Sequence, residues 1–104
     1  MTAVVCGDDL YAYGVMRACR ALGIVIPDDL SLVGFNDLPY SELAAPPLTS
    51  VNLFATKLGA EAARLLQRYM RTGKPPRSRQ LETSLVIRES TAAAPRSARR
   101  VARA

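Results

Sequence analysis

The sequence contains no histidine and no tryptophan, and it has only two cysteines and two phenylalanines among 104 residues. The absence of histidine removes the side chain that most often acts as a general base or binds a metal ion. Two cysteines without a secretory signal are typical of a reducing compartment, so we predict free thiols in a cytoplasmic protein. Neither a catalytic, a metal nor a cofactor site is expected on these grounds.

Long hydrophobic runs are also missing. No apolar stretch approaches the roughly 20 residues of a membrane-spanning helix, and the first residues lack the basic segment of a signal peptide. With 49% apolar and 22% charged residues, the composition is that of a globular domain with an aliphatic core. A length of 104 residues allows one domain at most, and no membrane partner is predicted.

The positive charge is concentrated in the second half of the chain. Of the net charge of +5, residues 1–56 contribute −4 and residues 57–104 contribute +9. Four arginines fall near the end: Arg96, Arg99, Arg100 and Arg103. Because residues 91–104 show no apolar pattern, we predict a disordered basic tail. The tail has no aromatic residues for base stacking, so a solvated tail is favoured over one that binds nucleic acid.

Apolar periodicity predicts an alternation of strands and helices. We expect buried strands over residues 3–6 and 30–35 and a helix over residues 9–22 between them, which Gly23 ends. A strand, a helix and a strand in this order form a right-handed βαβ unit whose strands are parallel. The predicted fold class is therefore α/β.

Two faces of the helix over residues 9–22 are predicted from helical spacing. The apolar face is expected to contain four residues: Tyr11, Val15, Ala18 and Leu22. The solvated face is expected to contain three others: Tyr13, Arg17 and Arg20. Since tyrosine and arginine are enriched in interfaces, this second face is a candidate dimer contact, and ordinary surface is the alternative.

The second half of the chain continues after a proline-rich loop. An extended piece over residues 48–51 is followed by a long helix over 54–71 and a strand over 80–88. The long helix has an apolar stripe: Leu58, Ala62, Leu65 and Tyr69. On its polar face, Glu61 has a favourable spacing to Arg64 for an ion pair.

Polar side chains directly follow both strands of the βαβ unit. Asp8 and Asp9 follow the first strand, and Asn36 and Asp37 follow the second. Because ligands of open parallel sheets bind beyond the carboxyl ends of the strands, both pairs are expected to face one crevice. Carboxylate and amide groups match the hydroxyls of a sugar, which both donate and accept hydrogen bonds.

Two other interpretations of these residues remain open. In the first, the four side chains only cap the helix and build turns, as Asp and Asn commonly do. In the second, the carboxylates of Asp8, Asp9 and Asp37 hold Mg²⁺ in an α/β enzyme, because hard cations take carboxylate oxygens. No nucleophile or oxyanion hole accompanies the carboxylates, which disfavours an enzyme.

Several short motifs occur in order along the chain: VVCGDDL at 4–10, IPDD at 26–29, SLVGFND at 31–37, PPLTSV at 46–51 and LVIREST at 85–91. In this order and at these spacings, residues 2 to about 91 resemble the C-terminal part of the LacI/GalR family of bacterial transcriptional regulators. The family combines a helix-turn-helix, a hinge helix and an effector-binding core whose two α/β lobes enclose a ligand.

The resemblance implies a partial periplasmic-binding-protein-like type I fold, with a βαβ unit of a parallel sheet, a long crossover helix and a final strand. Residues 1–51 and 80–90 would belong to the C-terminal lobe, and residues 52–79 would carry a helix of the other lobe. The DNA-binding domain and most of the first lobe are expected to be missing. The long helix should therefore have lost its packing partner.

The resemblance also implies a function. A small effector, either a sugar or a nucleobase-like molecule, would bind between the lobes and shift the population between two lobe arrangements. Asp8 stands where the family usually has Asn, and Asn36 where it usually has Asp, so both are expected to contact the ligand. Asp9 would be a helix cap, and the helix over residues 9–22 would contribute to the homodimer interface of the full-length protein. Operator DNA would be bound only through the missing N-terminal domain, and a stand-alone dimerising module is the alternative.

Overall fold

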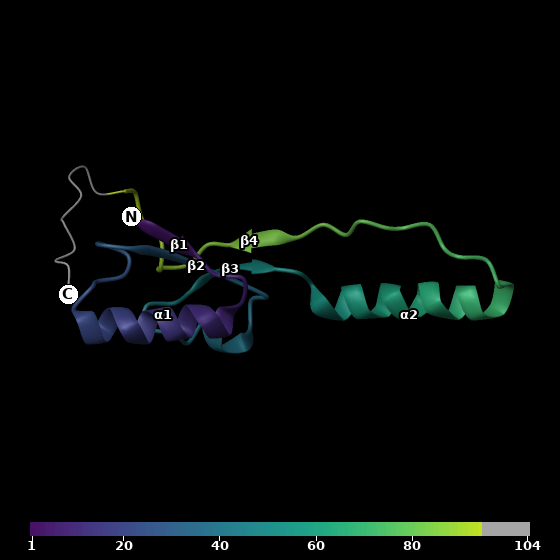
Figure 1. Cartoon of the computed structure of the whole chain (residues 1–104), viewed down its shortest axis with the longest axis horizontal. Coiled ribbons are helices and arrows are strands. Elements are labelled where there is room, and N and C mark those ends of the chain that lie inside the picture. Colours follow the sequence, from purple (N-terminus) through teal and green to yellow (C-terminus); the bar gives the residue numbers. More distant parts are fainter. Residues whose placement is uncertain (95–104) are drawn as a thin grey trace.

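Residues 1–94 are described by a computed structural model, in which two α-helices accompany one four-stranded mixed sheet (Figure 1). The elements in chain order are β1 (Ala3–Val5), α1 (Asp9–Leu22), β2 (Ser31–Phe35), the 3-10 helix η1 (Pro39–Ser41), β3 (Thr49–Asn52), α2 (Ala55–Thr72) and β4 (Ser84–Val86). The strand order is β1-β2-β3-β4, with the first three parallel and β4 antiparallel to β3. The predicted α/β fold with its βαβ unit is confirmed.

α1 begins and ends at the predicted residues because both of its ends carry local signals. The Oδ1 atom of Asp8 accepts a hydrogen bond from the backbone N–H of Leu10 (2.8 Å), which satisfies one donor of the first helical turn. Gly23 follows the helix with φ of 68°, a left-handed conformation that is accessible to glycine at little cost. The predicted boundaries of this helix are therefore confirmed.

The buried face of α1 differs from the predicted one. Ala12 and Cys19 are buried, and Met16 between them packs against the core. Tyr11 and Leu22, which were expected on the apolar face, are 70% and 65% exposed. The prediction was wrong for Tyr11 and Leu22 but right for Val15, which packs against the core, because the helix turns the side with Ala12 and Cys19 toward the sheet.

The core lies between α1 and the sheet, and its buried members are Cys6, Ala12, Leu32 and Leu48 (Figure 1). None of them is aromatic, so the core is aliphatic as predicted. Burial raises the pKa of the thiols of Cys6 and Cys19, and both free cysteines stay protonated at neutral pH. The expectation of buried free thiols is confirmed.

The opposite face of the sheet is covered by no helix of residues 1–94 (Figure 1). Val5 in β1 is 75% exposed and Leu85 in β4 is 55% exposed. A parallel sheet is buried on both faces only where helices cover both, and here α1 covers one. The prediction that the first strand is fully buried was therefore wrong.

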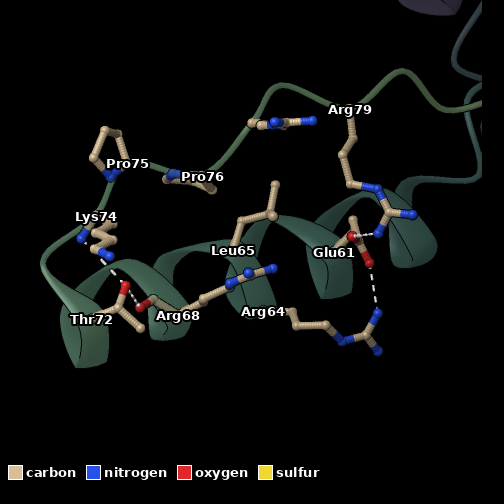
Figure 2. A pocket seen from close by; sticks show the side chains of 10 residues that line it. Glu61, Arg64, Leu65, Arg68, Thr72, Lys74, Pro75, Pro76 and Arg79 are labelled. Atoms are coloured by element: carbon tan, nitrogen blue, oxygen red, sulfur yellow. Dashed lines mark hydrogen bonds and ion pairs between the residues drawn. The ribbon is translucent and has the colours of Figure 1, made fainter.

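α2 extends away from the sheet, and the chain returns beside it through residues 73–83, here called the return segment (Figure 1). The described residues span 61 Å along their longest axis but only 24 and 23 Å along the other two. In the apolar stripe of α2, Leu65 is half-buried, whereas Leu58 and Tyr69 are each 47% exposed, and Leu66 next to the stripe is 58% exposed. The helix was predicted within one residue at each end, and among residues 1–94 the return segment contacts it through the ion pair of Arg79 with Glu61 (Figure 2). Neither described helix is long and apolar enough to cross a lipid bilayer.

β4 is shorter than predicted. The alternating pattern predicted a strand over residues 80–88, whereas pairing is restricted to Ser84–Val86. Ser84 already pairs with Asn52, which is the last residue of β3, so residues 80–83 have no strand beside them. An alternating sequence forms a strand only where a neighbour accepts and donates its backbone hydrogen bonds.

The last part of the described chain is attached to the sheet. The backbone N–H of Ala92 donates to Ser31 Oγ (3.1 Å), and that hydroxyl donates to the Ala92 carbonyl (3.2 Å). Ser90 is fully buried, and its Oγ accepts a hydrogen bond from the Thr49 N–H (2.8 Å). The rest of the predicted tail, residues 95–104, lies outside the described residues.

Candidate functional site

The carboxyl ends of β1 and β2 bring Asp8 and Asn36 into direct contact. Nδ2 of Asn36 donates a hydrogen bond to Oδ2 of Asp8 (2.6 Å), and both residues are half-buried. The other oxygen of Asp8 caps α1, so one carboxylate orients the helix and the amide together. We call these two residues the Asp8–Asn36 pair. The strand-end rule predicted their proximity, and their contact with a ligand stays a prediction.

The turn after β2 orients Asn36 by an unusual backbone. Asn36 and Asp37 have φ of 95° and 50°, in the left-handed region that residues with a Cβ adopt at a cost of roughly 1–2 kcal/mol. Two hydrogen bonds to β3 hold this turn: the Asn36 N–H donates to the Val51 carbonyl (2.9 Å), and the Asp37 N–H donates to Ser50 Oγ (3.0 Å). The ordered sheet therefore fixes the direction of the Asn36 side chain.

Asp37 joins this turn to the end of β3 and to the residues after β4. Its Oδ2 accepts a hydrogen bond from Nδ2 of Asn52 (3.0 Å), and its Oδ1 lies 2.8 Å from Nη2 of Arg88. The side chains of Asp37 and Arg88 are only 12% and 18% exposed, so this ion pair is screened less than a surface pair. Asn52 ends β3, and Arg88 follows β4. The sequence analysis did not identify Asn52 or Arg88 as site residues, although a lone arginine within the apolar LVIREST motif was a usable signal.

Asp9 has a different role from the predicted helix cap. It is fully buried, and its Oδ1 accepts a hydrogen bond from Ser50 Oγ (2.6 Å). Its Oδ2 accepts hydrogen bonds from the Leu38 N–H (2.7 Å) and from Ser41 Oγ (2.5 Å). The expectation for Asp9 was wrong because Asp8 already occupies the cap position. Asp9 instead attaches the loop after β2 and strand β3 to the start of α1.

Gly34 in β2 provides the space for this buried carboxylate. A Cβ atom at position 34 would lie 2.1 Å from Oδ1 of Asp9 and 2.9 Å from Cδ2 of Leu48. Both distances are shorter than nonbonded atoms tolerate, so any side chain here would displace the carboxylate or the core leucine. The glycine of the SLVGFND motif is thus explained by the close approach of Asp9.

The three carboxylates considered for Mg²⁺ are engaged elsewhere. Asp9 accepts three hydrogen bonds, Asp37 binds Asn52 and Arg88, and Asp8 caps α1. Within residues 1–94, no group of three or more Asp, Glu, Cys or His side chains is arranged to hold a metal ion. The geometry therefore does not favour the magnesium-dependent enzyme.

The candidate dimer residues line one groove between α1 and the loop after η1. The groove has a volume of about 450 Å³, and Leu43 on its rim is 80% exposed. Tyr13 was expected on a solvated face but is half-buried, and its hydroxyl lies 2.9 Å from Ser41 Oγ. Arg17 and Arg20 line the same groove and are exposed. The structure brings the three residues together, and their role in a dimer stays a prediction.

Comparison with known sequences identifies the relatives of this chain. The family of periplasmic binding protein-like domains matches residues 1–91. The HTH-type transcriptional regulator MalR of Streptomyces coelicolor is 43% identical over 95 residues, which cover 90% of this chain and 28% of MalR. The chain therefore spans little more than a quarter of the length of this relative.

Solved structures with the same fold are also regulators. The transcriptional regulator CelR in complex with cellobiose has a TM-score of 0.80 and 38% identity, over 86% of this chain and 28% of that chain. A LacI family regulator from Enterococcus faecium with bound ribose has a TM-score of 0.80 and 28% identity, over 88% of this chain and 34% of that chain. The chain belongs to the family of periplasmic binding protein-like domains, in the form that LacI-family transcriptional regulators carry.

Proposed function

We propose that this chain is the ligand-sensing part of a LacI-type transcriptional regulator and that the Asp8–Asn36 pair contacts a small polyhydroxylated effector, a sugar in the first instance. The observation that carries the proposal is the direct hydrogen bond between these two side chains at the carboxyl ends of β1 and β2. Cellobiose and ribose are bound in two of the similar structures, which supports a sugar.

The chemistry of the pair suits a hydroxyl group. Asp8 Oδ2 accepts, and the Asn36 amide both accepts through Oδ1 and donates through its second N–H. Within residues 1–94 no hydrogen bond engages Asn36 Oδ1, so this atom is available to a donor from a ligand. A sugar hydroxyl can donate to one residue of the pair and accept from the other, because each hydroxyl does both.

Transmission to the second lobe would pass through Asp37. This residue follows Asn36 directly, and it binds Asn52, the last residue before the chain leaves β3 for α2, and Arg88, which follows β4. A ligand that binds the two lobe arrangements with different affinity shifts their populations. A change at Asn36 would reach both Asn52 and Arg88 through the carboxylate of Asp37. The whole regulator would use this shift to alter its affinity for operator DNA.

The remaining assignments follow from membership of the family. We propose a homodimer in the whole protein, with the groove of Tyr13, Arg17 and Arg20 at the contact, a cytoplasmic location and no enzymatic activity. DNA recognition would reside outside the described residues, which contain no helix-turn-helix. A stand-alone dimerising module finds no specific support in the site geometry.

The test is a titration of the full chain with cellobiose and with ribose, in which NMR measures the chemical shifts of backbone and side-chain amides. We expect weak binding, because residues 1–94 form one side of a cleft, with the largest shifts at the Asn36 side-chain amide. Asp8→Ala should abolish these shifts, whereas Asp28→Ala, an exposed acidic position away from the pair, should leave them unchanged. Shifts that survive Asp8→Ala would contradict the proposed site, and micromolar binding by this chain alone would contradict the expectation that a second lobe completes it.

A further inference from the structure

The buried carboxylate of Asp9 lies between the turn after β2 and the groove beside α1. Its Oδ1 accepts a hydrogen bond from Ser50 Oγ (2.6 Å), and Ser50 Oγ in turn accepts one from the Asp37 N–H (3.0 Å). Its Oδ2 accepts from Ser41 Oγ (2.5 Å), which lies 2.9 Å from the Tyr13 hydroxyl. We propose that these five residues, here called the Asp9 network, couple the turn after β2 to whatever binds in the groove.

Each hydroxyl of the Asp9 network has only one direction in which it can donate. A carboxylate oxygen accepts, so Ser50 and Ser41 each donate their single hydroxyl proton to Asp9. Ser41 then has only lone pairs left, and the Tyr13 hydroxyl must be the donor of the 2.9 Å contact. Both ends of the network therefore donate toward the same carboxylate.

The centre of the Asp9 network is shielded from water. Asp9, Ser41 and Ser50 are fully buried, and their donors and acceptors all lie within residues 9–50. Away from water a hydrogen bond is electrostatically stronger, and hydrogen bonds that share an atom polarise one another. A change at one end of the network is therefore expected to alter the hydrogen bond at the other end.

The turn after β2 is the part of the molecule that responds. Asn36 and Asp37 have φ of 95° and 50°, and such strained conformations persist only where the surrounding contacts fix them. Two acceptors fix this turn, the Val51 carbonyl and Ser50 Oγ. The strength of the hydrogen bond to Ser50 therefore sets how much of the time Asn36 keeps the conformation in which it contacts Asp8.

The other end of the Asp9 network reaches the groove. Ser41 is the last residue of η1, and its neighbours Tyr40, Leu43 and Ala44 line the groove together with Tyr13. A second copy that seats on the groove would change the environment of the Tyr13 hydroxyl and, through it, that of Ser41. The inference rests on the proposed function, which assigns the ligand contact to one end of the network and the dimer contact to the other.

Competition for one carboxylate gives this coupling a definite sign. The Tyr13 hydroxyl polarises Ser41, which then donates more strongly to Asp9. Because the donors share the negative charge of one carboxylate, a weaker bond from Ser41 leaves more of that charge for Ser50. Ser50 then donates more strongly, and its oxygen becomes a better acceptor for the Asp37 N–H. Loss of the Tyr13 hydroxyl should therefore tighten the turn.

The experiment measures the amide proton of Asp37 by NMR in the full chain without ligand, since a stronger hydrogen bond moves an amide proton downfield. Tyr13→Phe keeps the ring and removes the hydroxyl, and we expect a downfield shift. Ser41→Ala removes the donor itself and should give a larger downfield shift, whereas Ser50→Ala removes the acceptor and should give an upfield shift. Tyr11→Phe is the matched control, because it removes a hydroxyl from a 70% exposed position of the same helix and should leave the Asp37 amide unchanged.

The signs of these shifts separate coupling from general loosening of the fold. Upfield shifts in all three network variants would mean that each substitution only loosens the turn, and they would overturn the proposal. An unchanged Asp37 amide in Tyr13→Phe, or an equal change in Tyr11→Phe, would overturn it as well. Circular dichroism checks that the variants of the two buried serines fold, and Tyr13→Phe decides the question if they do not.

A titration with ribose separates this inference from the proposed function. If ribose causes no shift at the Asn36 side-chain amide of the unaltered chain, the proposed function fails, while the ligand-free shifts at Asp37 still decide the coupling. If ribose binds, Tyr13→Phe should bind it about twofold to fivefold more tightly, because a firmer turn keeps Asn36 in its binding conformation for more of the time. Equal affinity of Tyr13→Phe and Tyr11→Phe for ribose would overturn the coupling to the ligand site.

Discussion

The sheet half of the molecule (residues 1–54 and 84–92) and the α2 half (residues 55–83) are stabilised in different ways. In the sheet half, buried polar contacts join residues far apart in sequence, such as Asp9 with Ser50. In the α2 half, the helix has its own hydrogen bonds and the ion pairs of Glu61 with Arg64 and Arg79, while its apolar stripe stays largely exposed. A helix without tertiary packing is marginal in water, so the two halves should differ in their resistance to local unfolding.

The largest effect is expected at Gly34, where the sheet half is packed most tightly. Gly34→Ala places a Cβ 2.1 Å from the Asp9 carboxylate, and we expect it to lower the free energy of unfolding by about 3 kcal/mol, from overpacking and lost buried hydrogen bonds. Urea denaturation followed by circular dichroism measures the change. Gly14→Ala is the matched control, because a Cβ at this exposed helical position meets nothing and should stabilise by up to about 1 kcal/mol. Similar midpoints for the two variants would contradict the close approach of Asp9.

The same substitution in each half should give a second, smaller contrast. Leu32 is fully buried in β2, and Leu32→Ala should cost about 2–3 kcal/mol through lost burial and a residual cavity, at the low end for a buried leucine because the core is small. Leu66→Ala in α2 should cost less than about 1 kcal/mol, because this side chain is already largely in water. Urea midpoints of the two variants measure the difference. A large loss of stability at Leu66 would show that this side of α2 is covered in solution, for example by a second copy.

The smallest effect is a pH dependence confined to the α2 half. The pKa of Glu61 lies below its ordinary value of 4.5, chiefly because Arg79 donates a hydrogen bond to the carboxylate. A lowered pKa contributes stability that is present above pH 4.5 and is lost as the pH falls through the pKa of the folded state. Below pH 4.5 we therefore expect the return segment to detach from α2, seen as amide shifts around Arg79. Glu61→Gln should remove this transition, and its persistence in that variant would assign it to another carboxylate.

The sequence predicted those features that depend on local signals. α1 was predicted at its true boundaries because Asp8 and Gly23 act on the adjacent turns. The Asp8–Asn36 pair was predicted because a general rule locates functional groups at strand ends, and that rule needs only the order of the elements.

Other features depend on contacts that no local pattern contains. The hydrogen-bond donors to Asp9 come from positions 38, 41 and 50, so its burial follows from the tertiary arrangement alone. The predicted strand over residues 80–88 failed at its start for a related reason, since β3 ends opposite Ser84. The exposed Val5 likewise reflects which face of the sheet α1 covers, and composition cannot indicate that.

The pairing of Asn52 with Ser84 has a mechanical consequence. The chain leaves the sheet after one of these residues and re-enters it at the other, and paired residues of antiparallel strands lie only about 5 Å apart. A body tethered at two points so close together can rotate about them but can slide very little. The α2 half should therefore rotate as a unit about this pair of residues. A small rotation there becomes a displacement of many ångströms at the far end of the helix.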